Sequence, residues 1–309
     1  TMDFFLILFP IFSIFVVGFI AQKVLRFDIQ NLSKMSLYVL SPFLAFRTFY
    51  THELTFDYVY LAFYVFALCL GLVLIISIWS KLMRYSENIR CGMILSACFM
   101  NNGNYGVPVI LMFFGAQGFD LAIIMLVLQQ FVMSTIGIYY AAKGSDRQSE
   151  ASSAKYALIR VIKMPVAYGA LLGILFQLIN IPIGDSVMKS IAMIGDSSIV
   201  VIMIILGMQL AMIHIREIDL PKLSISLIVK MVISPILAYF LVMLLPLPET
   251  YKTILIILAA MPAAANTTLQ AVFFNTQPKL VSSSTFISTI LSLITLPIVM
   301  WLLNVAIPA

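Results

Sequence analysis

The residues best suited to chemistry lie inside an apolar stretch, at positions 101–108, which read NNGNYGVP. The amides of Asn101, Asn102 and Asn104 each carry two N–H donors and one carbonyl acceptor, so they can bind a small polar solute directly. Tyr105 adds a hydroxyl group beside them. These side chains supply hydrogen bonds but no activated nucleophile, so the chemistry that they predict is binding.

A second polar stretch, MPAAANTTLQ at residues 261–270, has a similar composition. It places Pro262, Asn266 and Thr267 among apolar residues. No phosphate-binding loop, catalytic triad or metal-ligand motif stands out along the chain, and these are the groups that an enzyme site needs. We therefore expect a binding protein rather than an enzyme, with no metal site and no cofactor.

The proline in each stretch predicts an interrupted helix. Pro108 has no backbone N–H and clashes with the preceding turn, so a continuous helix is expected to break there, and Gly103 and Gly106 permit unwound backbone. A proline kink that is satisfied locally by side chains or water is the plainer alternative for one such stretch. Two stretches in corresponding positions favour a binding site.

The composition places these stretches in a membrane protein. Of 309 residues, 62% are hydrophobic and 10% are charged, whereas soluble domains have about 45–50% apolar and about 25% charged residues. Apolar runs long enough to cross a bilayer as a helix recur along the chain. The first run has no basic leader or small-residue cleavage pattern, so we expect a retained helix and not a signal peptide. We predict an all-α membrane protein with ten transmembrane helices, at residues 4–22, 32–50, 58–81, 90–114, 120–142, 158–179, 187–213, 223–245, 252–274 and 281–305.

The basic residues predict the orientation of these spans. All of the 18 Lys and Arg residues flank odd-numbered connections except Arg47, Lys189 and Lys252. Because Lys and Arg concentrate on the cytoplasmic side of a membrane, we expect a multi-pass protein of the cell membrane with both termini outside. This bias also accounts for the net charge of +5, so no nucleic-acid partner is expected.

A polar linker at residues 143–157 predicts two halves of five spans, at residues 1–142 and 158–309. An odd number of spans makes the second half enter from the opposite face, which gives an inverted repeat of the kind found in secondary transporters. The fourth and ninth spans are then counterparts, and they carry the two polar stretches. We expect them to be broken crossover helices whose half-helix N-termini bring partial positive charge to one point, which suits an anion.

Other polar residues lie within the predicted spans. Asp196 is a candidate for ion coupling, because an acid inside a membrane is costly and is usually functional. The alternative, which we prefer, is that the seventh helix begins close to Asp196, so that the sequence GDSS caps its N-terminus. One of Gln129 and Gln130, in the fifth span, is expected to line the site, and Gln129 is taken as the candidate. Lys230 and Arg47 are expected to extend toward the interface.

Small polar residues recur at helical spacing in the tenth predicted span. Such a stripe could line a substrate path, but it could also form the close-packed face that small residues give to membrane helices, and we prefer the packing face. The stripe consists of Ser284, Ser288, Ser292 and Thr295.

Four stretches resemble one known family. The sequence NNGNYGVPVI is similar to the crossover motif of the auxin efflux carrier family, in its bacterial branch. Three further stretches are also similar, and together the four cover nearly the whole chain: LYVLSPFLAFRTF (37–49), IGDSSIVVIMIILGMQLA (194–211) and STFISTILSLITLPIVMWLL (284–303).

The resemblance implies a ten-helix inverted-repeat fold, shared in outline with bile acid sodium symporters, and alternating access of the elevator type. Family members carry organic anions, including plant auxin and, in bacteria, malate or malonate. The crossover prolines of the family fall on Pro108 and Pro262, and its polar crossover positions fall on Asn104 and Asn266. Plant members have a long cytoplasmic loop where this chain has a short linker, and their fourth-span motif differs, so indole-acetate is not supported as a substrate.

The expected function is secondary transport of a small organic anion, a mono- or dicarboxylate such as malate or malonate. A sodium- or proton-coupled carrier of another small solute is the alternative. A membrane-embedded enzyme or a sensor is disfavoured, because the sequence offers no catalytic cluster and no output domain. The expected partners are the anion and the lipid bilayer, and a homodimer is an open alternative to a monomer.

Overall fold

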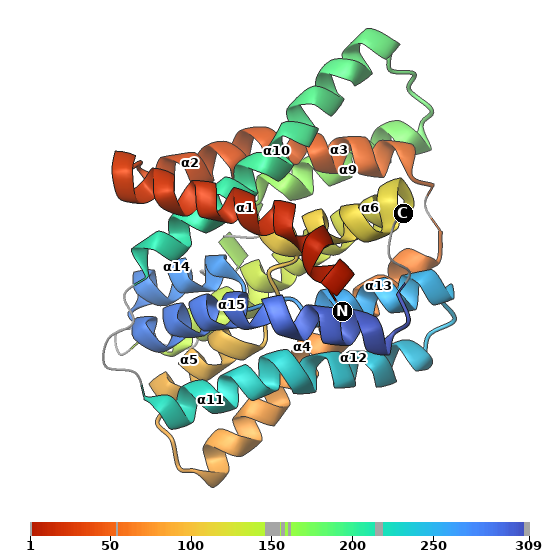
Figure 1. Cartoon of the computed structure of the whole chain (residues 1–309). Helices are drawn as coiled ribbons and strands as arrows, with labels where there is room; N and C mark the ends of the chain where they lie inside the picture. The colour runs from red at the N-terminus through yellow and green to blue at the C-terminus, as the bar shows by residue number, and fades with distance from the viewer. Residues whose placement is uncertain are drawn as a thin grey trace.

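The computed structural model consists of helices (Figure 1). It describes residues 2–53, 55–145, 155, 158–159, 162–213 and 219–305, with side chains from Leu8 onward. Within these residues there is no β-strand, only one isolated bridge. The prediction of an all-α protein is therefore confirmed, whereas most of the predicted linker at 143–157 lies outside the described residues.

Except between Lys143 and Pro165, where much of the chain lies outside the described residues, the described helices follow one another with short connections. Those of the first half are α1 (Met2–Leu25), α2 (Ile29–Met35), α3 (Ser41–Thr51), α4 (Asp57–Leu82), α5 (Glu87–Ala97), α6 (Val107–Val132) and α7 (Ile138–Lys143). Those of the second half are α9 (Pro165–Leu178), α10 (Asp185–Met212), α11 (Leu220–Ile228), α12 (Ser234–Met243), α13 (Glu249–Ala259), α14 (Ala265–Phe274) and α15 (Pro278–Leu302).

Six helical segments of the described chain are long and apolar enough to cross a membrane, by length and composition. One of them, Asn102–Lys143, has 42 residues, which at about 1.5 Å per residue is about twice the thickness of a bilayer core. Gly115 interrupts it with φ 60° and ψ −151°, a backbone conformation that glycine tolerates. This break falls between the predicted fourth and fifth spans. The six segments are Leu8–Leu25, Asp57–Leu82, Asn102–Lys143, Asp185–Met212, Leu220–Met243 and Pro278–Leu302.

Three π-helical turns each precede a proline, at the same distance along the chain. The π-helical turns Ser36–Leu40, Asn102–Gly106 and Val229–Ile233 each end two residues before a proline, at Pro42, Pro108 and Pro235. In each case the residue just before the proline donates its N–H five residues back instead of four. Because a proline ring clashes with the carbonyl four residues before it, we attribute the widened turn to the proline.

The helices form two groups (Figure 1). The first, here called the glycine-packed group, contains α1, α2, α3, α9 and α10, with α1 packed mainly on α10 and α3 packed mainly on α9. A Cβ atom at Gly18 would collide with the carbonyl of Ile204, and one at Gly169 would collide with that of Pro42. Small residues let membrane helices approach this closely. The remaining helices, α4–α7 and α11–α15, form the second group, here called the crossing group.

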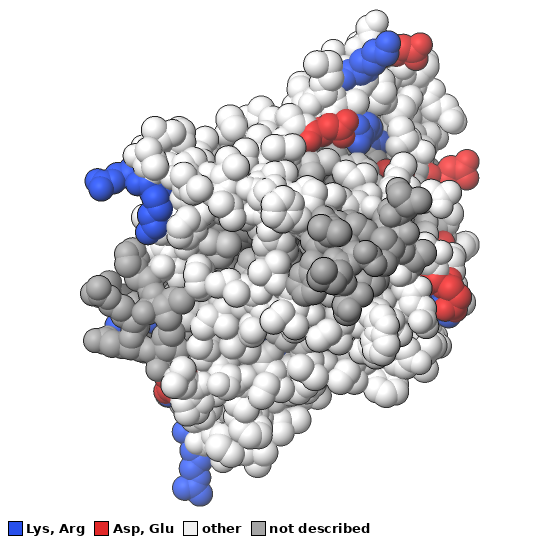
Figure 2. All heavy atoms as spheres, viewed as in Figure 1, with Lys and Arg blue, Asp and Glu red and all other residues white. Residues whose placement is uncertain are grey.

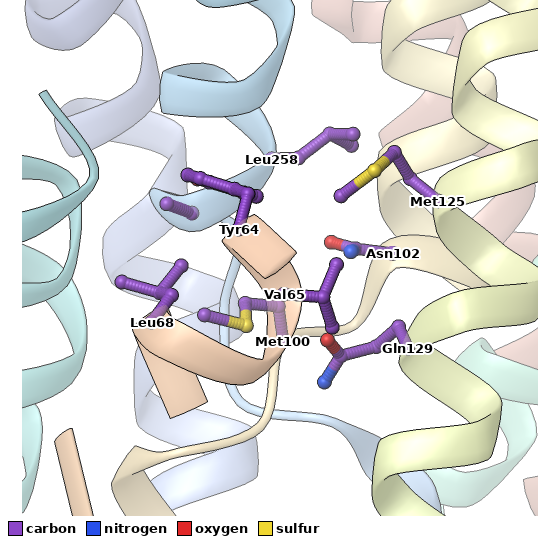
Figure 3. Close-up of a pocket in the computed structure, with 9 residues that line it drawn as sticks. Tyr64, Val65, Leu68, Met100, Asn102, Met125, Gln129 and Leu258 are labelled. Atoms are coloured by element: carbon purple, nitrogen blue, oxygen red, sulfur yellow. The ribbon is translucent and has the colours of Figure 1, made fainter. Parts of the chain in front are cut away.

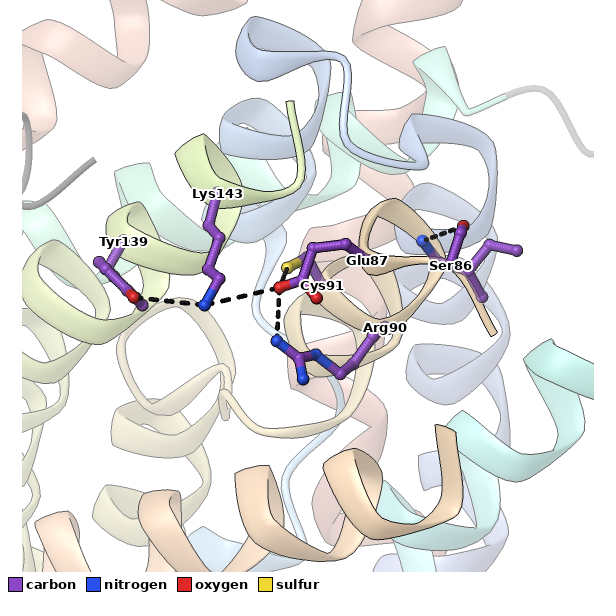
Figure 4. Close-up of polar contacts among 7 residues, drawn as sticks. Ser86, Glu87, Arg90, Cys91, Tyr139 and Lys143 are labelled. Atoms are coloured by element: carbon purple, nitrogen blue, oxygen red, sulfur yellow. Dashed lines mark hydrogen bonds and ion pairs between the residues drawn. The ribbon is translucent and has the colours of Figure 1, made fainter. Parts of the chain in front are cut away.

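Charged residues lie mainly at the ends of the helices. Figure 2 shows Lys, Arg, Asp and Glu side chains toward two opposite edges of the displayed face, with a broad uncharged band between them. At one end of the crossing group, the Glu87 carboxylate of α5 pairs with Arg90 and lies 3.7 Å from Lys143 Nζ of α7 (Figure 4). This contact ties the start of α5 to the end of α7.

Candidate binding site at the crossing of two interrupted helices

Two helices of the crossing group are interrupted. One run ends with α5 at Ala97 and resumes at Asn102, with Asn101 outside helical conformation at φ −84° and ψ 57°. The predicted break at Pro108 is therefore wrong in position, because the helical path is already restored six residues before this proline. Pro108 instead lies in the first turn of α6, where its missing N–H widens the preceding turn.

The second interruption lies between α13, which ends at Ala259, and α14, which begins at Ala265. The two unwound segments pair with each other through an isolated antiparallel bridge between Met100 and Ala263. The Asn101 N–H donates to the Pro262 carbonyl at 2.9 Å, and the Ala264 N–H donates to the Phe99 carbonyl at 3.1 Å. The two polar stretches of the sequence therefore lie side by side, each satisfying backbone groups of the other.

The crossing brings together helix ends of both polarities. The C-terminal ends, which carry partial negative charge, receive hydrogen bonds from side chains. Ala259 O accepts from Lys230 Nζ at 3.2 Å and from Ser234 Oγ at 2.8 Å, and Ser96 O in the last turn of α5 accepts from a serine of α15 at 3.1 Å. These donors offset the negative ends, whereas the N-terminal ends at Asn102 and Ala265 carry partial positive charge.

A small cavity lies beside the first unwound segment (Figure 3). Its volume is about 10 Å³, which is room for about one water molecule. Asn102 and Gln129 point into it from the side of α6, and α4 covers the opposite side. The lining residues are Tyr64, Val65, Leu68, Met100, Asn102, Met125, Gln129, Leu258 and Ala259.

Three amides at this place have buried atoms without a hydrogen-bond partner among the described residues. They are Asn101 Nδ2, Asn102 Oδ1 and Gln129 Nε2. Their side chains are almost fully enclosed, with exposed fractions of 5%, 3% and 4% for the whole residues. A buried polar group without a partner costs free energy, so these atoms are suited to a polar ligand that supplies the missing bonds.

Other candidates from the sequence are already engaged or only partly buried. The Tyr105 hydroxyl lies 2.9 Å from Ser292 Oγ, and its ring packs against Phe12 and Phe15. Thr267 is fully buried and donates to the Ala264 carbonyl at 2.8 Å. Asn104 and Asn266, at the starts of the two resumed helices, are half-buried.

The serine stripe of α15 packs against the crossing, as preferred from the sequence. Ser288 Oγ accepts the Ala263 N–H at 3.0 Å, Ser284 donates to Ser96 O, and Ser292 pairs with Tyr105. All three serines are buried. They fix the unwound backbone in place rather than line the cavity.

Asp196 does not cap a helix, and that prediction is wrong. α10 begins at Asp185, three turns earlier, so Asp196 lies inside a continuous helix. Its carboxylate lies 2.8 Å from Arg47 of α3. The Arg47 guanidinium also lies 5.9 Å from the ring centre of Phe119 in α6. Arg47 therefore contacts both helix groups.

Lys230 is also placed differently from the prediction. Its exposed fraction is 0%, and its ammonium reaches the end of α13 instead of the membrane surface. It lies in the π-helical turn Val229–Ile233. The sequence did carry a signal for this position, because Lys230 and Ser234 are four residues apart and share one helix face, directly before Pro235.

Long apolar helices, paired interruptions and buried unpaired amides define a multi-pass membrane protein with an internal polar site. Comparison with known proteins gives the family. A model of the family described as "Membrane transport protein" matches residues 3–300, so the chain belongs to this family, and the resemblance to auxin efflux carriers is confirmed. An uncharacterized transporter of Methanothermobacter thermautotrophicus is 24% identical over 273 residues, which is 88% of each chain. An uncharacterized transporter of Methanocaldococcus jannaschii is 27% identical over 255 residues, which is 77% of each chain.

Proposed function

We propose that this membrane transporter is a secondary carrier of a small organic anion, a mono- or dicarboxylate such as malate or malonate. One observation carries the proposal. The unpaired Gln129 Nε2 lines a buried cavity, and the unpaired Asn101 Nδ2 lies in the adjoining unwound segment, at a crossing whose negative helix ends are satisfied by donors. The unpaired Asn102 Oδ1, which also lines the cavity, is an acceptor and suits a hydroxyl group of the solute. A carboxylate can accept hydrogen bonds from amide N–H groups and is attracted by helix N-termini.

The proposed site combines residues of both interrupted helices. Asn101, Asn102 and Gln129 offer unpaired amides, and Asn104 and Asn266 offer half-buried amides at the starts of the resumed helices. Tyr105 and Thr267 support the site through side-chain hydrogen bonds, the first with the Ser292 hydroxyl and the second to the Ala264 carbonyl. Pro108 and Pro262 shape the two segments, the first by widening a turn and the second by accepting a backbone hydrogen bond.

The transport step in this proposal is of the elevator type. A cavity of about 10 Å³ is too small for malonate, so the site has to widen before it binds. The division of the helices into a glycine-packed group and a crossing group supports a movement in which the crossing group carries the anion along the glycine-packed group. Arg47 and Phe119, which touch across the two groups, would then separate or change partners during the movement.

The proposed topology has ten spans in two inverted halves of five, at residues 1–142 and 158–309, with both termini outside the cell membrane. Two packing relations support it. α1 of the first half packs on α10 of the second, and α9 of the second half packs on α3 of the first, which is what a two-fold relation between the halves produces. A homodimer is the oligomer to test first, by mass measurement in detergent.

Uptake of radiolabelled acids into proteoliposomes tests the function. We expect counterflow exchange of at least one member of a panel that includes malate and malonate, and loss of exchange when both Asn102 and Gln129 are replaced. Exchange of none of these acids would contradict the proposal. A second candidate, a sodium- or proton-coupled carrier of another small solute, is favoured if a neutral solute is exchanged, and Asp196 is then the first ion-coupling residue to test.

A further inference from the structure

We propose that Lys230 is the proton-carrying group of this transporter, so that a proton crosses the membrane together with the anion. The inference rests on the proposed function and names its coupling ion. It starts from the position of one side chain. Lys230 is fully buried, and its Nζ donates to the Ala259 carbonyl at 3.2 Å.

The surroundings of Lys230 do not neutralise its charge. Among the described residues, no Asp or Glu forms an ion pair with it. The titratable side chains that face it from neighbouring helices are two buried thiols, Cys69 of α4 and Cys98 at the end of α5. A buried ammonium without a carboxylate is costly, so a helix end is the main group that stabilises the charge here.

The Lys230 ammonium lies at the crossing of the two interrupted helices. Ala259 is the last residue of α13, and it also lines the cavity beside Asn102 and Gln129. Lys230 therefore lies directly behind the wall of the proposed substrate site. The π-helical turn around it, which precedes Pro235, brings Lys230 and Ser234 to the same carbonyl.

This arrangement favours a proton over a sodium ion as the coupling ion. A sodium ion at a helix C-terminus needs several carbonyl oxygens, and half-helix C-termini supply them in other carriers. Here the exposed carbonyl of α13 already receives two hydrogen bonds, from Lys230 Nζ and Ser234 Oγ. The tethered ammonium takes the position that a metal cation would need, and it can exchange a proton.

The cycle balances as follows. With an anion in the site, Lys230 is an ammonium, and its positive charge offsets one negative charge during the movement across the membrane. When the cavity opens and the anion leaves, one N–H bond of the ammonium breaks and the proton passes to water. The empty carrier returns with a neutral amine, which takes a proton from water on the first side. One proton therefore moves in the same direction as each anion.

Proteoliposomes test this coupling with radiolabelled malonate, in sodium-free buffers, with valinomycin and equal potassium holding the membrane potential at zero. With one proton per anion, a gradient of about one pH unit, alkaline inside, drives about tenfold accumulation. Lys230→Met removes the charge, and Lys230→Arg keeps a charge that does not release a proton. Both variants should lose the accumulation, and Lys230→Arg, which keeps the charge that offsets the anion, should still exchange malonate at equal pH. Ser234→Ala, which removes the other donor to Ala259, should keep the dependence on the pH gradient.

The outcomes separate the inference from the function on which it rests. Accumulation by both Lys230 variants that equals that of the wild-type protein overturns the inference and leaves the proposed function intact. If neither variant can be purified, the wild-type protein decides: a sodium gradient that replaces the pH gradient, or no accumulation above protein-free liposomes, overturns it. If malonate, malate and the rest of the panel show no exchange at all, the proposed function fails, and the inference fails with it.

Discussion

Arg47 and Asp196 form an ion pair of 2.8 Å that joins α3 to α10 within the glycine-packed group. The side chains are unequally exposed, at 20% for Arg47 and 50% for Asp196. The carboxylate is thus held by a neighbouring helix and not by the N-terminus of its own helix. This gives Asp196 a structural role that can be tested separately from ion coupling.

Asp196→Asn should lower the stability of the protein. The change leaves Arg47 without its carboxylate, and a partly exposed pair of this kind contributes about 1 kcal/mol or less. We expect a small decrease in the unfolding temperature in detergent, with unchanged dependence of transport on a pH gradient. The charge-reversed pair Arg47→Asp with Asp196→Arg should recover part of the loss. Normal stability together with lost coupling would show instead that Asp196 carries the coupling ion.

Asn104→Ala and Asn266→Ala should each weaken substrate binding. Removing one partner of a hydrogen bond in a dry site costs about 1–3 kcal/mol, which lowers affinity about 5- to 150-fold. Affinity is measured from the concentration dependence of malonate or malate exchange. Asn31→Ala is the control, because Asn31 lies on α2 and bonds only to Asp28 there. Unchanged affinity in both crossing variants would place the site elsewhere.

Gln129→Leu should lower substrate affinity without lowering the stability of the protein. The Gln129 Nε2 atom is buried without a partner, so an apolar replacement should leave stability unchanged or raise it by about 1 kcal/mol. Substrate affinity should fall if the amide meets the anion. Gln130→Leu is the matched control, since Gln130 is adjacent on α6 and does not line the cavity. Equal effects of the two variants on affinity would argue against the cavity as the site.

Pro108→Ala should slow transport without destabilising the protein. Alanine restores an N–H that can bond to the carbonyl of Asn104, so the π-helical turn Asn102–Gly106 can tighten into an α-helix and rotate Asn102 away from the cavity. Exchange rates and hydrogen exchange of this segment report the change. Pro42→Ala makes the same backbone change in α3, outside the crossing, and should leave transport closer to normal. A similar loss of transport in both variants would point to general helix packing.

Cysteine labelling tests the proposed topology. The α4–α5 and α9–α10 connections lie at opposite ends of the helices (Figure 1), and the basic residues place the first in the cytoplasm. Met83→Cys should therefore resist an impermeant thiol reagent in intact cells, and Ser186→Cys should react. The natural cysteines Cys69, Cys91 and Cys98 are buried, so their background should be low. Reaction of Met83→Cys and protection of Ser186→Cys would reverse the orientation.

The sequence predicted the features that depend on local residue chemistry. Apolar length indicated the helices, and the two proline-containing polar stretches indicated the interruptions that pair at Met100 and Ala263. Its site candidates include Asn102 and Gln129, which line the cavity, but it did not predict which candidates are engaged by other side chains. Asn101 and Gln129 have unpaired amide N–H groups whereas Tyr105 and Thr267 are engaged, by Ser292 of α15 and by the Ala264 carbonyl just before α14.

The wrong predictions for Asp196 and Lys230 share one physical cause. Asp196 was assigned to a cap and Lys230 to the membrane surface because each was judged from its own segment. Their actual partners, Arg47 and the Ala259 carbonyl, lie far away along the chain. A single charged residue in an apolar helix indicates that a partner is needed, but only the tertiary fold shows which group that partner is.

The mutual packing of α1 with α10 and of α3 with α9 has a consequence for biosynthesis. Each early helix finds its main neighbour only after the ribosome has reached Pro165 and the residues beyond it. At about 5–20 residues per second, the interval after α1 leaves the ribosome is roughly 10–30 s. During that time the surface at Gly18, which packs on Ile204 of α10 in the folded protein, lacks its partner. A nascent chain arrested before Pro165 would keep these surfaces open and would be a natural target for membrane proteolysis.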